Sequence, residues 1–493
     1  VFPDGPWGPA SHIQRGAITY DFMVPGDPLT PGWASLPGAK RIAESEAVSL
    51  PHIVALPLSW QDAKPLLENM DGPVAPKDWQ GGLPIVYRLG GSVVAHLQVE
   101  MDNSTQPYYV VEGRITGSEF PDEWILLGNH HDAWVYGGVD PSSGTASMME
   151  MTRVLGDLLK KGVRPRRTII FASWDGEEVG LTGSTEWGEQ FADELRTKLV
   201  AYLNVDSSAS GPNFEGGASG SLAPMLVETT RSIADPGGGS LHDAWLKTTS
   251  AERAAAHEKQ PVTDANVVNT RIGSGSDHTV FLNFLGRPVM TLEFDGPYGV
   301  YHSVYDDYYW MNHFGDPGYK YHATMSQLWG TVALRLAQAD VLPLDFAYYG
   351  DIINQFLDEL AKNKNFDAAK LDLQSAHKAA KALQETSDAT QSTLQPALAS
   401  GKLSLAQTAS INQLLMKGEA NFILPDGIPG RPWFKHILYS ARYTYAHLEL
   451  PAITEAVEAG NWSEARKQTD ILIKALNAET EVMKKVAAVL QEN

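Results

Sequence analysis

A chain of 493 residues, of which 43% are hydrophobic and 20% charged, is long enough for about three globular domains. The net charge of −21 argues against nucleic acid and anionic membrane surfaces as partners, because both would repel the protein. The chain contains no cysteine, which excludes disulfides and a thiol nucleophile and leaves His, Asp and Glu as the ligands for any metal.

Residues 1–104 are rich in proline and glycine and carry short β-like runs at 53–56 and 93–97. This pattern predicts a mixed, loop-rich domain that is incomplete. The first residues form neither a methionine start nor a signal peptide, so we expect a processed or shortened chain. No stretch of about 18 apolar residues occurs, and no part of the chain is therefore expected to span a membrane.

Residues 105–342 alternate between strand-like and helix-like patterns. A helix is indicated by apolar residues at helical spacing between 148 and 159, and the apolar runs that indicate buried strands are 125–128, 168–172, 200–205 and 289–292. This alternation predicts a doubly wound α/β fold, with a mostly parallel sheet and helices on both faces.

Residues 343–493 show helical periodicity instead. One apolar stripe lies between 346 and 360 and another between 472 and 490. Both stripes indicate a helical domain, in which they form either a core or a subunit interface.

Metal-type side chains follow the predicted strands. His130 and Asp132 follow the first strand, Glu177 and Glu178 the second, and Asp206 the third. His302 follows the last strand, and Asp140 lies in a loop before the first helix. Because the carboxyl ends of parallel strands meet at one edge of a sheet, these side chains are expected to converge.

Two histidines and three carboxylates without a thiolate suit a pair of zinc ions bridged by one carboxylate. A water shared by the two metals would lose a proton near neutral pH, and an adjacent carboxylate could accept it. Glu177 and Glu178 supply both kinds of carboxylate, one for a metal and one for the water.

Simpler interpretations apply to some of these residues. A single aspartate at a strand end is usually a turn or cap residue. We expect His131 to face away from the metals and His278 to be structural. The segment 273–276 resembles a phosphate-binding loop but lacks the Gly-Lys-Ser/Thr ending. The joint placement at four strand ends favours a metal centre.

The same segments carry a resemblance to the glutamate carboxypeptidase II and transferrin receptor family of zinc exopeptidases. The resemblance covers nearly the whole chain, and its motifs are His130–Pro141, Glu177–Trp187, Asn204–Ser208 and Tyr301–Tyr305. It implies a partial protease-associated domain at 1–104, a di-zinc peptidase domain at 105–342 and a helical dimerisation domain at 343–493. A homodimer is expected, and the missing N-terminal part of the precursor either is cleaved away or stays bound as a separate fragment.

Roles for individual residues follow from the resemblance. His130 and Asp206 would hold one zinc, Glu178 and His302 the other, and Asp140 would bridge them. Glu177 would be the general base and then the acid. Asp132 would orient His130. The substrate-binding residues would be Tyr301, Gly275, Glu293 and Tyr445.

The resemblance also implies a structural calcium ion. Its ligands would be the side chains of Glu186 and Glu189 and the backbone carbonyls of Thr30 and Trp33. Oxygen ligands suit calcium. The simpler interpretation of the two glutamates is an exposed helix face.

The sequence departs from the family pattern around the substrate. The family's substrate-binding lysine–tyrosine pair corresponds to Thr444-Tyr445, so the lysine is lost. A family asparagine that binds the substrate's terminal carboxylate aligns with Ala17. The family's arginine patch is replaced around 289–294, where Glu293 brings a negative charge. These changes disfavour an acidic substrate. We therefore predict an aminopeptidase or dipeptidase, with Glu293 receiving the substrate's α-ammonium group or simply lying at an exposed strand end.

Three alternatives to this prediction are a glutamate-releasing carboxypeptidase, a non-catalytic receptor-like protein and a phosphoester hydrolase. The retention of all five ligands and Glu177 disfavours the receptor, and the lack of a cationic clamp disfavours the phosphoester hydrolase. Glycosylation sequons at Asn103 and Asn461 favour a secreted, extracellular or vacuolar/lysosomal-type location.

Overall fold

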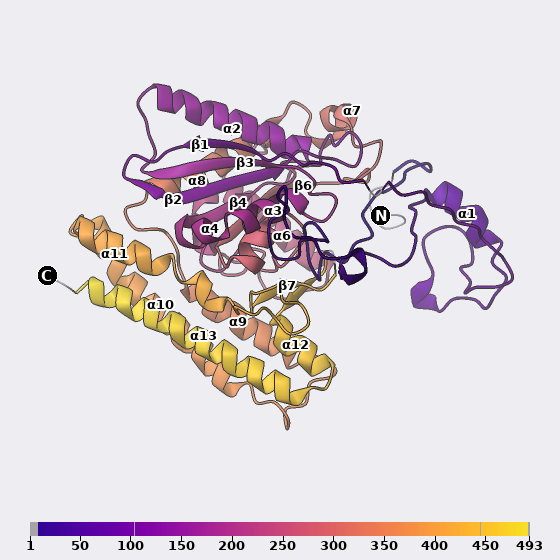
Figure 1. Cartoon of the computed structure of the whole chain (residues 1–493). Helices are drawn as coiled ribbons and strands as arrows, with labels where there is room; N and C mark the ends of the chain where they lie inside the picture. Colours follow the sequence, from indigo (N-terminus) through magenta and orange to yellow (C-terminus); the bar gives the residue numbers. More distant parts are fainter. Residues whose placement is uncertain (1–7, 103, 444, 492–493) are drawn as a thin grey trace.

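A computed structural model describes residues 8–102, 104–443 and 445–491. Its centre is a six-stranded sheet in the order β1-β3-β2-β4-β6-β5, of which all strands but β5 are labelled in Figure 1. The strands are β1 (Val111–Ile115), β2 (Phe120–His130), β3 (Arg167–Trp174), β4 (Leu199–Asn204), β5 (Asn213–Ala218) and β6 (Val289–Asp295).

The four central strands are parallel to one another, whereas β1 and β5 pair antiparallel at the two edges. The central strands are almost fully buried because helices cover both faces, which explains their continuous apolar runs. In register, Leu126 lies beside Ile170 and Tyr202, and His130 lies beside Trp174. The parallel pairing thus brings the carboxyl ends of β2, β3, β4 and β6 to one edge, as predicted.

Helices pack on both faces of the sheet, which confirms the doubly wound α/β prediction (Figure 1). On one face lie α2 (Ser142–Lys160), α5 (Ala223–Arg231) and α8 (Lys320–Gln338). On the other face lie α3 (Thr182–Gln190) and α4 (Ala192–Lys198), while α6 (Leu241–Ala255) packs on β5. Short helical segments complete this part: η3 (Val280–Phe284), α7 (Tyr308–Trp310) and η4 (Met311–Gly315).

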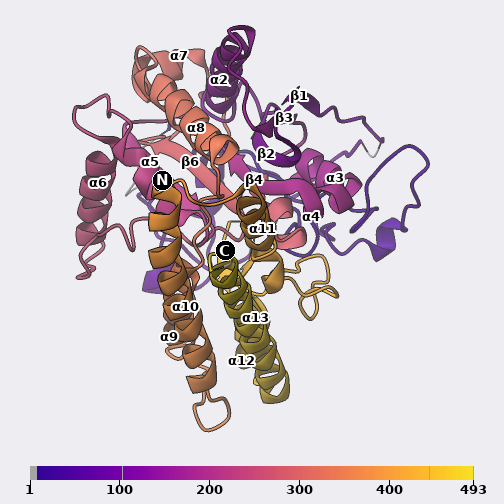
Figure 2. The same cartoon turned by 90° about the vertical axis from the view of Figure 1, so that its left-hand side faces the viewer.

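The C-terminal region is a bundle in which α10 and α13 run side by side away from the sheet (Figure 2). Its elements are α9 (Ala347–Leu360), α10 (Gln374–Ala399), α11 (Leu405–Leu415), η5 (Glu419–Phe422), β7 (Tyr439–Ala441), β8 (His447–Glu449), α12 (Pro451–Glu458) and α13 (Trp462–Val489). Leu472 and Leu476 of the second stripe are fully buried within this chain. The stripe therefore contributes to the bundle core.

The N-terminal segment departs from its β-like sequence pattern. It contains η1 (Glu44–Glu46), α1 (Trp60–Glu68) and η2 (Lys77–Trp79) and extends away from the sheet (Figure 1). Residues 53–56 and 93–97, predicted as β-like, form no strand; Val94 is 92% exposed. A strand needs a hydrogen-bonding neighbour, and the described residues provide none for these runs. None of the described helices is long and apolar enough to cross a membrane.

Candidate metal centre

The five predicted zinc ligands converge at the carboxyl edge of the sheet in two groups that share Asp140. In the first group, His130 Nε2 lies 3.2 Å from Asp140 Oδ1 and 3.0 Å from Asp206 Oδ1. In the second, His302 Nε2 lies 3.2 Å from Asp140 Oδ2 and 3.1 Å from Glu178 Oε2. The two oxygens of one carboxylate thus face the two histidines, which is the geometry that a bridging ligand requires.

Both histidines present the same ring nitrogen to the carboxylates. The Nδ1–H of His130 donates to the backbone carbonyl of Asp132, and the Nδ1–H of His302 donates to that of Arg15, both at 3.0 Å. This leaves Nε2 of each ring directed at the carboxylates, as in zinc-bound histidines whose other nitrogen is held by a hydrogen bond. The donor set of two imidazoles and three carboxylates fits zinc.

The negative charges of the carboxylates at this centre favour a nearby positive charge. Burial alone would lower the pKa of His130, but Asp206 and Glu177 raise it well above its usual value. Burial likewise acts against the charged form of His302, yet hydrogen bonds with Asp140 and Glu178 raise its pKa to about 9. A centre that favours protons on its histidines is one in which a metal cation would be stabilised by the same carboxylates.

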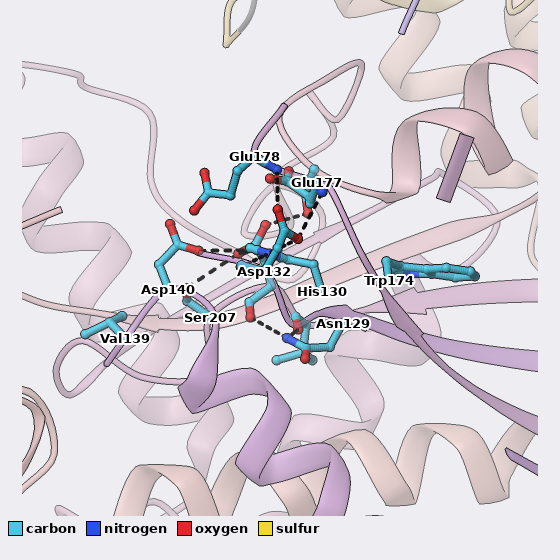
Figure 3. Close-up of polar contacts among 12 residues, drawn as sticks. Asn129, His130, Asp132, Val139, Asp140, Trp174, Glu177, Glu178 and Ser207 are labelled. Carbon is cyan, nitrogen blue, oxygen red and sulfur yellow. Dashed lines mark hydrogen bonds and ion pairs between the residues drawn. The ribbon is translucent and has the colours of Figure 1, made fainter. Parts of the chain in front are cut away.

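Glu177 lies beside this centre as a half-buried carboxylate. Burial raises its pKa well above the usual range, and the neighbouring Asp206 adds to this effect. The backbone N–H groups of Glu177 and Glu178 donate to the two oxygens of Asp132, at 3.0 and 3.2 Å. Figure 3 shows these contacts from Asp132, with Asp140 and Glu178 facing each other beyond His130. Asp132 therefore anchors the loop that carries both glutamates, a role that its sequence position did not reveal.

His302 is held in an uncommon backbone conformation. Its φ of 56° lies in the left-handed region, which disfavours residues with a Cβ and costs about 1 kcal/mol or more. Two contacts with Arg15 hold it: the ring contact described above, and the Arg15 N–H donating to the His302 carbonyl at 3.1 Å. The N-terminal segment thereby positions a predicted metal ligand.

Two further residues that the sequence analysis missed support the ligands. The Ser276 hydroxyl donates to Asp206 Oδ2 at 2.6 Å. The carboxylate of Asp306 accepts the backbone N–H groups of Val139 and Asp140 and the hydroxyl of Tyr298. Neither residue stands in a ligand-like sequence pattern, and only the fold brings them to the centre.

The two histidines that we expected to be structural lie outside the ligand groups. His131 directly follows β2, and its ring contacts the Ser173 hydroxyl at 2.8 Å. His278 donates Nε2–H to the carbonyl of Ile272, and burial lowers its pKa to about 4. Both placements agree with the expectation.

Two cavities meet at the centre, separated by residues that line both, among them Glu177, His302, Gly275 and Tyr445. The first has a volume of about 340 Å³ and extends past Tyr301 to Glu293 and the outer face of β5 and β6. The second, of about 190 Å³, is bounded by the N-terminal segment from Gln14 to Asp21, including Ala17.

The predicted substrate residues all line these cavities. Tyr301 stacks on His302 with ring centroids 3.6 Å apart, and its hydroxyl lies 2.7 Å from that of Tyr445. Gly275 has a φ of 102°, a backbone conformation that residues with a side chain rarely adopt. Because glycine has no side chain, its backbone lines both cavities directly. Thr444 lies outside the described residues.

The residues predicted to bind calcium form a separate cluster. The Glu186 carboxylate accepts the backbone N–H groups of Asp27 and Ser35, which flank the turn containing Thr30 and Trp33. Glu189 Oε1 accepts the indole N–H of Trp433, whereas Oε2 is buried with no hydrogen-bond partner among the described residues. Both glutamates are partly buried and engaged by these contacts, so the exposed-helix interpretation is wrong. Burial raises the pKa of Glu186 to about 7 and that of Glu189 to about 8.

Residues 111–313 match the peptidase family M28, and residues 364–484 match the transferrin receptor-like dimerisation domain. The aminopeptidase NAALADL1 of Mus musculus is 32% identical and aligns with 99% of this chain and 68% of its own length. The chain belongs to the glutamate carboxypeptidase II and transferrin receptor family.

Other members of this family are similarly related. The probable glutamate carboxypeptidase LAMP1 of Arabidopsis thaliana is 35% identical over 93% of this chain and 64% of its own length. The aminopeptidase NAALADL1 of Rattus norvegicus is 32% identical over 97% of this chain and 67% of its own. The chain therefore spans about two thirds of the length of these family members, and both kinds of named activity occur among them.

Proposed function

We propose that this chain carries the active site of a co-catalytic di-zinc exopeptidase that hydrolyses terminal peptide bonds of small peptides, as an aminopeptidase or dipeptidase. The observation that carries the proposal is the position of Asp140, whose two oxygens each lie 3.2 Å from a different histidine Nε2. His130 and Asp206 would hold one zinc, and Glu178 and His302 the other.

The side chains around the centre suit different steps of peptide hydrolysis. When bound, two zinc ions would supply a more acidic water and polarise the carbonyl of the peptide bond. Glu177, half-buried beside both ligand groups, accepts the proton of the attacking water and returns it to the leaving amine. Tyr301, fixed by stacking on His302 and by its contact with Tyr445, donates its hydroxyl hydrogen to the oxygen that becomes negative.

The first cavity supports specificity for a free amino terminus. Glu293 faces this cavity and has no hydrogen-bond or ion-pair partner among the described residues. Its side chain is solvent-exposed on β6, as the strand-end interpretation expected, yet desolvation by the surrounding cavity and the neighbouring carboxylates Glu215 and Asp295 raise its pKa to about 8. A substrate α-ammonium group would supply the missing positive charge, whereas an acidic side chain would be repelled.

Kinetics on matched peptides test this proposal. We expect free dipeptides and tripeptides of uncharged residues to be cleaved, and their N-acetylated counterparts to be cleaved at least tenfold more slowly. Metal analysis of the same preparation should give two zinc ions per chain. Preferential cleavage of an N-acetylated peptide ending in glutamate would overturn the aminopeptidase assignment, and a metal-free, inactive chain would overturn the peptidase itself.

A glutamate-releasing carboxypeptidase is the second candidate, favoured by the names of the plant relatives. The same N-acetylated peptide separates the two candidates. A receptor-like protein without catalysis is disfavoured, because all five ligand side chains and Glu177 are retained and brought together.

We also propose that Glu186, Glu189 and the carbonyls of Thr30 and Trp33 bind one calcium ion. The unpartnered Glu189 Oε2 and the oxygen-only ligand set support the assignment. Calcium should raise the melting temperature of the parent chain, and this increase should disappear in Glu189→Gln.

The assembly and location of the protein follow as proposals. The match to a dimerisation domain supports a homodimer, and a separate N-terminal fragment would cover the exposed runs at 53–56 and 93–97. Asn461 caps α13 and is solvent-exposed, which suits a glycosylated protein in a secretory, extracellular or vacuolar compartment. Asn103 lies outside the described residues. Light scattering and glycosidase treatment of protein from a secreting host would test both features.

A further inference from the structure

The outer face of β5 and β6 places an unusual set of charges in the first cavity. Glu215 and Glu293 lie directly opposite each other on the two antiparallel strands. Asp295 is two residues beyond Glu293, on the same face of β6. Opposed like charges destabilise a sheet, and directly opposite residues have Cβ atoms only about 5 Å apart. All three side chains are solvent-exposed, and together they form an acidic wall of the candidate substrate cavity.

Asp295 accepts a hydrogen bond from the Ser210 hydroxyl at 3.2 Å, but no lysine or arginine among the described lining residues pairs with Glu215 or Glu293. Arg271, the arginine of the cavity lining, is engaged by Glu359 and Glu449, each at 2.5 Å. Neither Glu215 nor Glu293 has a hydrogen-bond or ion-pair partner among the described side chains. One α-ammonium group could pair with only one of these carboxyl groups.

The two glutamates line different parts of the cavity system. Glu293 lines the first cavity, together with Asp140 and Asp206, but not an adjoining depression. Glu215 lines both the first cavity and that depression, which contains neither of the two aspartates. Glu293 is therefore on the side of the metals, where a substrate's α-ammonium group would be, and Glu215 lies farther out.

Beyond Glu215 the cavity has room for a long side chain. Glu215 and Gly216 also line the adjoining depression of about 860 Å³, which includes Glu252 and Trp245. A lysine or arginine side chain that passed Glu293 would thus reach carboxylates and solvent rather than a closed apolar wall.

We propose that Glu215 and Asp295 are specificity-determining residues that select substrates with a lysine or arginine on the amino side of the cleaved bond. This inference rests on the proposed function, with Glu293 receiving the α-ammonium group and the outer carboxylates receiving the side-chain cation. The guanidinium group, with five N–H donors, matches two neighbouring carboxylates especially well.

The test compares arginine with citrulline, which has nearly the same shape but no charge. We expect kcat/KM for Arg-Leu to exceed that for citrullyl-leucine by at least tenfold in the parent chain. Glu215→Gln should reduce this ratio at least threefold. The kcat/KM for citrullyl-leucine should stay within twofold of its value in the parent chain. Glu385→Gln, the same charge change on the exposed surface of α10, should leave the ratio unchanged.

Binding measurements separate this inference from the proposed function. Calorimetry with argininamide and citrullinamide needs no turnover, and argininamide should bind at least tenfold more tightly. Equal cleavage of both dipeptides, equal binding of both amides, or a ratio unaffected by Glu215→Gln would overturn the specificity assignment. Absence of turnover with preserved argininamide selectivity would instead contradict only the peptidase proposal.

Discussion

Carboxylates are buried in two regions of this chain, and their surroundings differ. At the junction of the sheet and the helical bundle, Glu419 accepts hydrogen bonds from the hydroxyls of Tyr349 and Ser221 and faces His436 Nε2 at 3.1 Å. Close by, Asn421 donates to Glu479. We call this set the Glu419 network. At the metal centre, by contrast, Asp140, Glu178 and Asp206 face each other and share only two histidines.

The comparison shows what distinguishes a candidate metal centre from a structural polar core. Burial of a carboxylate is common to both regions. In the Glu419 network, neutral donors from tyrosine, serine and asparagine stabilise the carboxylates locally. At the metal centre, several carboxylates converge on the same small volume, and only added positive charge can compensate for them.

Removal of a single negative charge from each region should give opposite results. Asp140→Asn should abolish binding of at least one metal and nearly all turnover, because Asp140 faces both ligand groups. Glu479→Gln should retain both metals and full activity, since burial already raises the pKa of Glu479 to about 8. Elemental analysis and peptide kinetics measure both outcomes. Two metals in Asp140→Asn would contradict its bridging position.

Glu177→Gln tests the chemistry apart from the metals. We expect turnover to fall by about 10²–10⁴-fold, the usual contribution of a general acid–base, while two metals remain bound. The glutamine keeps the size of the side chain but cannot accept the proton. Loss of metal in this variant would mean that Glu177 is a ligand rather than the proton acceptor.

A smaller effect is expected at Ser276, which donates to Asp206 and is not itself a predicted ligand. Ser276→Ala should weaken metal binding by about 10–100-fold, as is usual when a supporting hydrogen bond of a ligand is lost. Competition with a chelator measures the affinity. Ser392→Ala, on the exposed surface of α10, is a matched control and should not change it. Equal affinity of Ser276→Ala and the parent chain would exclude a role in metal binding.

The smallest effect on activity, but a clear effect on stability, is expected from pH in the Glu419 network. The pKa of Glu479 is raised from 4.5 to about 8 by burial, so the folded protein favours its protonated form. Its contribution to stability is full below pH 4.5 and is lost as pH rises towards 8. Glu479→Gln cannot ionise and should show a flatter decline of melting temperature between pH 5 and about 8. Parallel declines would contradict this assignment.

Much of the fold was predictable because its signals are local. Continuous apolar runs indicated the central parallel strands, and the ligand-type residues stood directly after them. The antiparallel edge strands β1 and β5 were not predicted: β1 is largely exposed, and β5 contains two consecutive glycines, so neither presents a buried apolar run. The β-like runs at 53–56 and 93–97 do not form strands. A high β-propensity does not by itself provide the neighbouring strand with which a strand must hydrogen-bond.

The residues that support the metal ligands could not be predicted from local sequence patterns. Arg15 meets His302 across 287 positions, and Asp306 meets the Asp140 backbone across 166. Arg15 acts on the His302 ring through its backbone carbonyl, which every residue has, so its identity carries no signal. Asp306 and Ser276 are of residue types that serve as caps and turns throughout the chain.

The sequence alone determined the family, the parallel α/β centre and the residue types of a zinc site, because apolar periodicity and strand-end motifs are written in consecutive positions. Only the tertiary structure decided that Asp140 faces both histidines, that Asp132 anchors the Glu177 loop and that Glu215 opposes Glu293. Those relations depend on strand order and register, which arise from packing between segments that are distant in the chain.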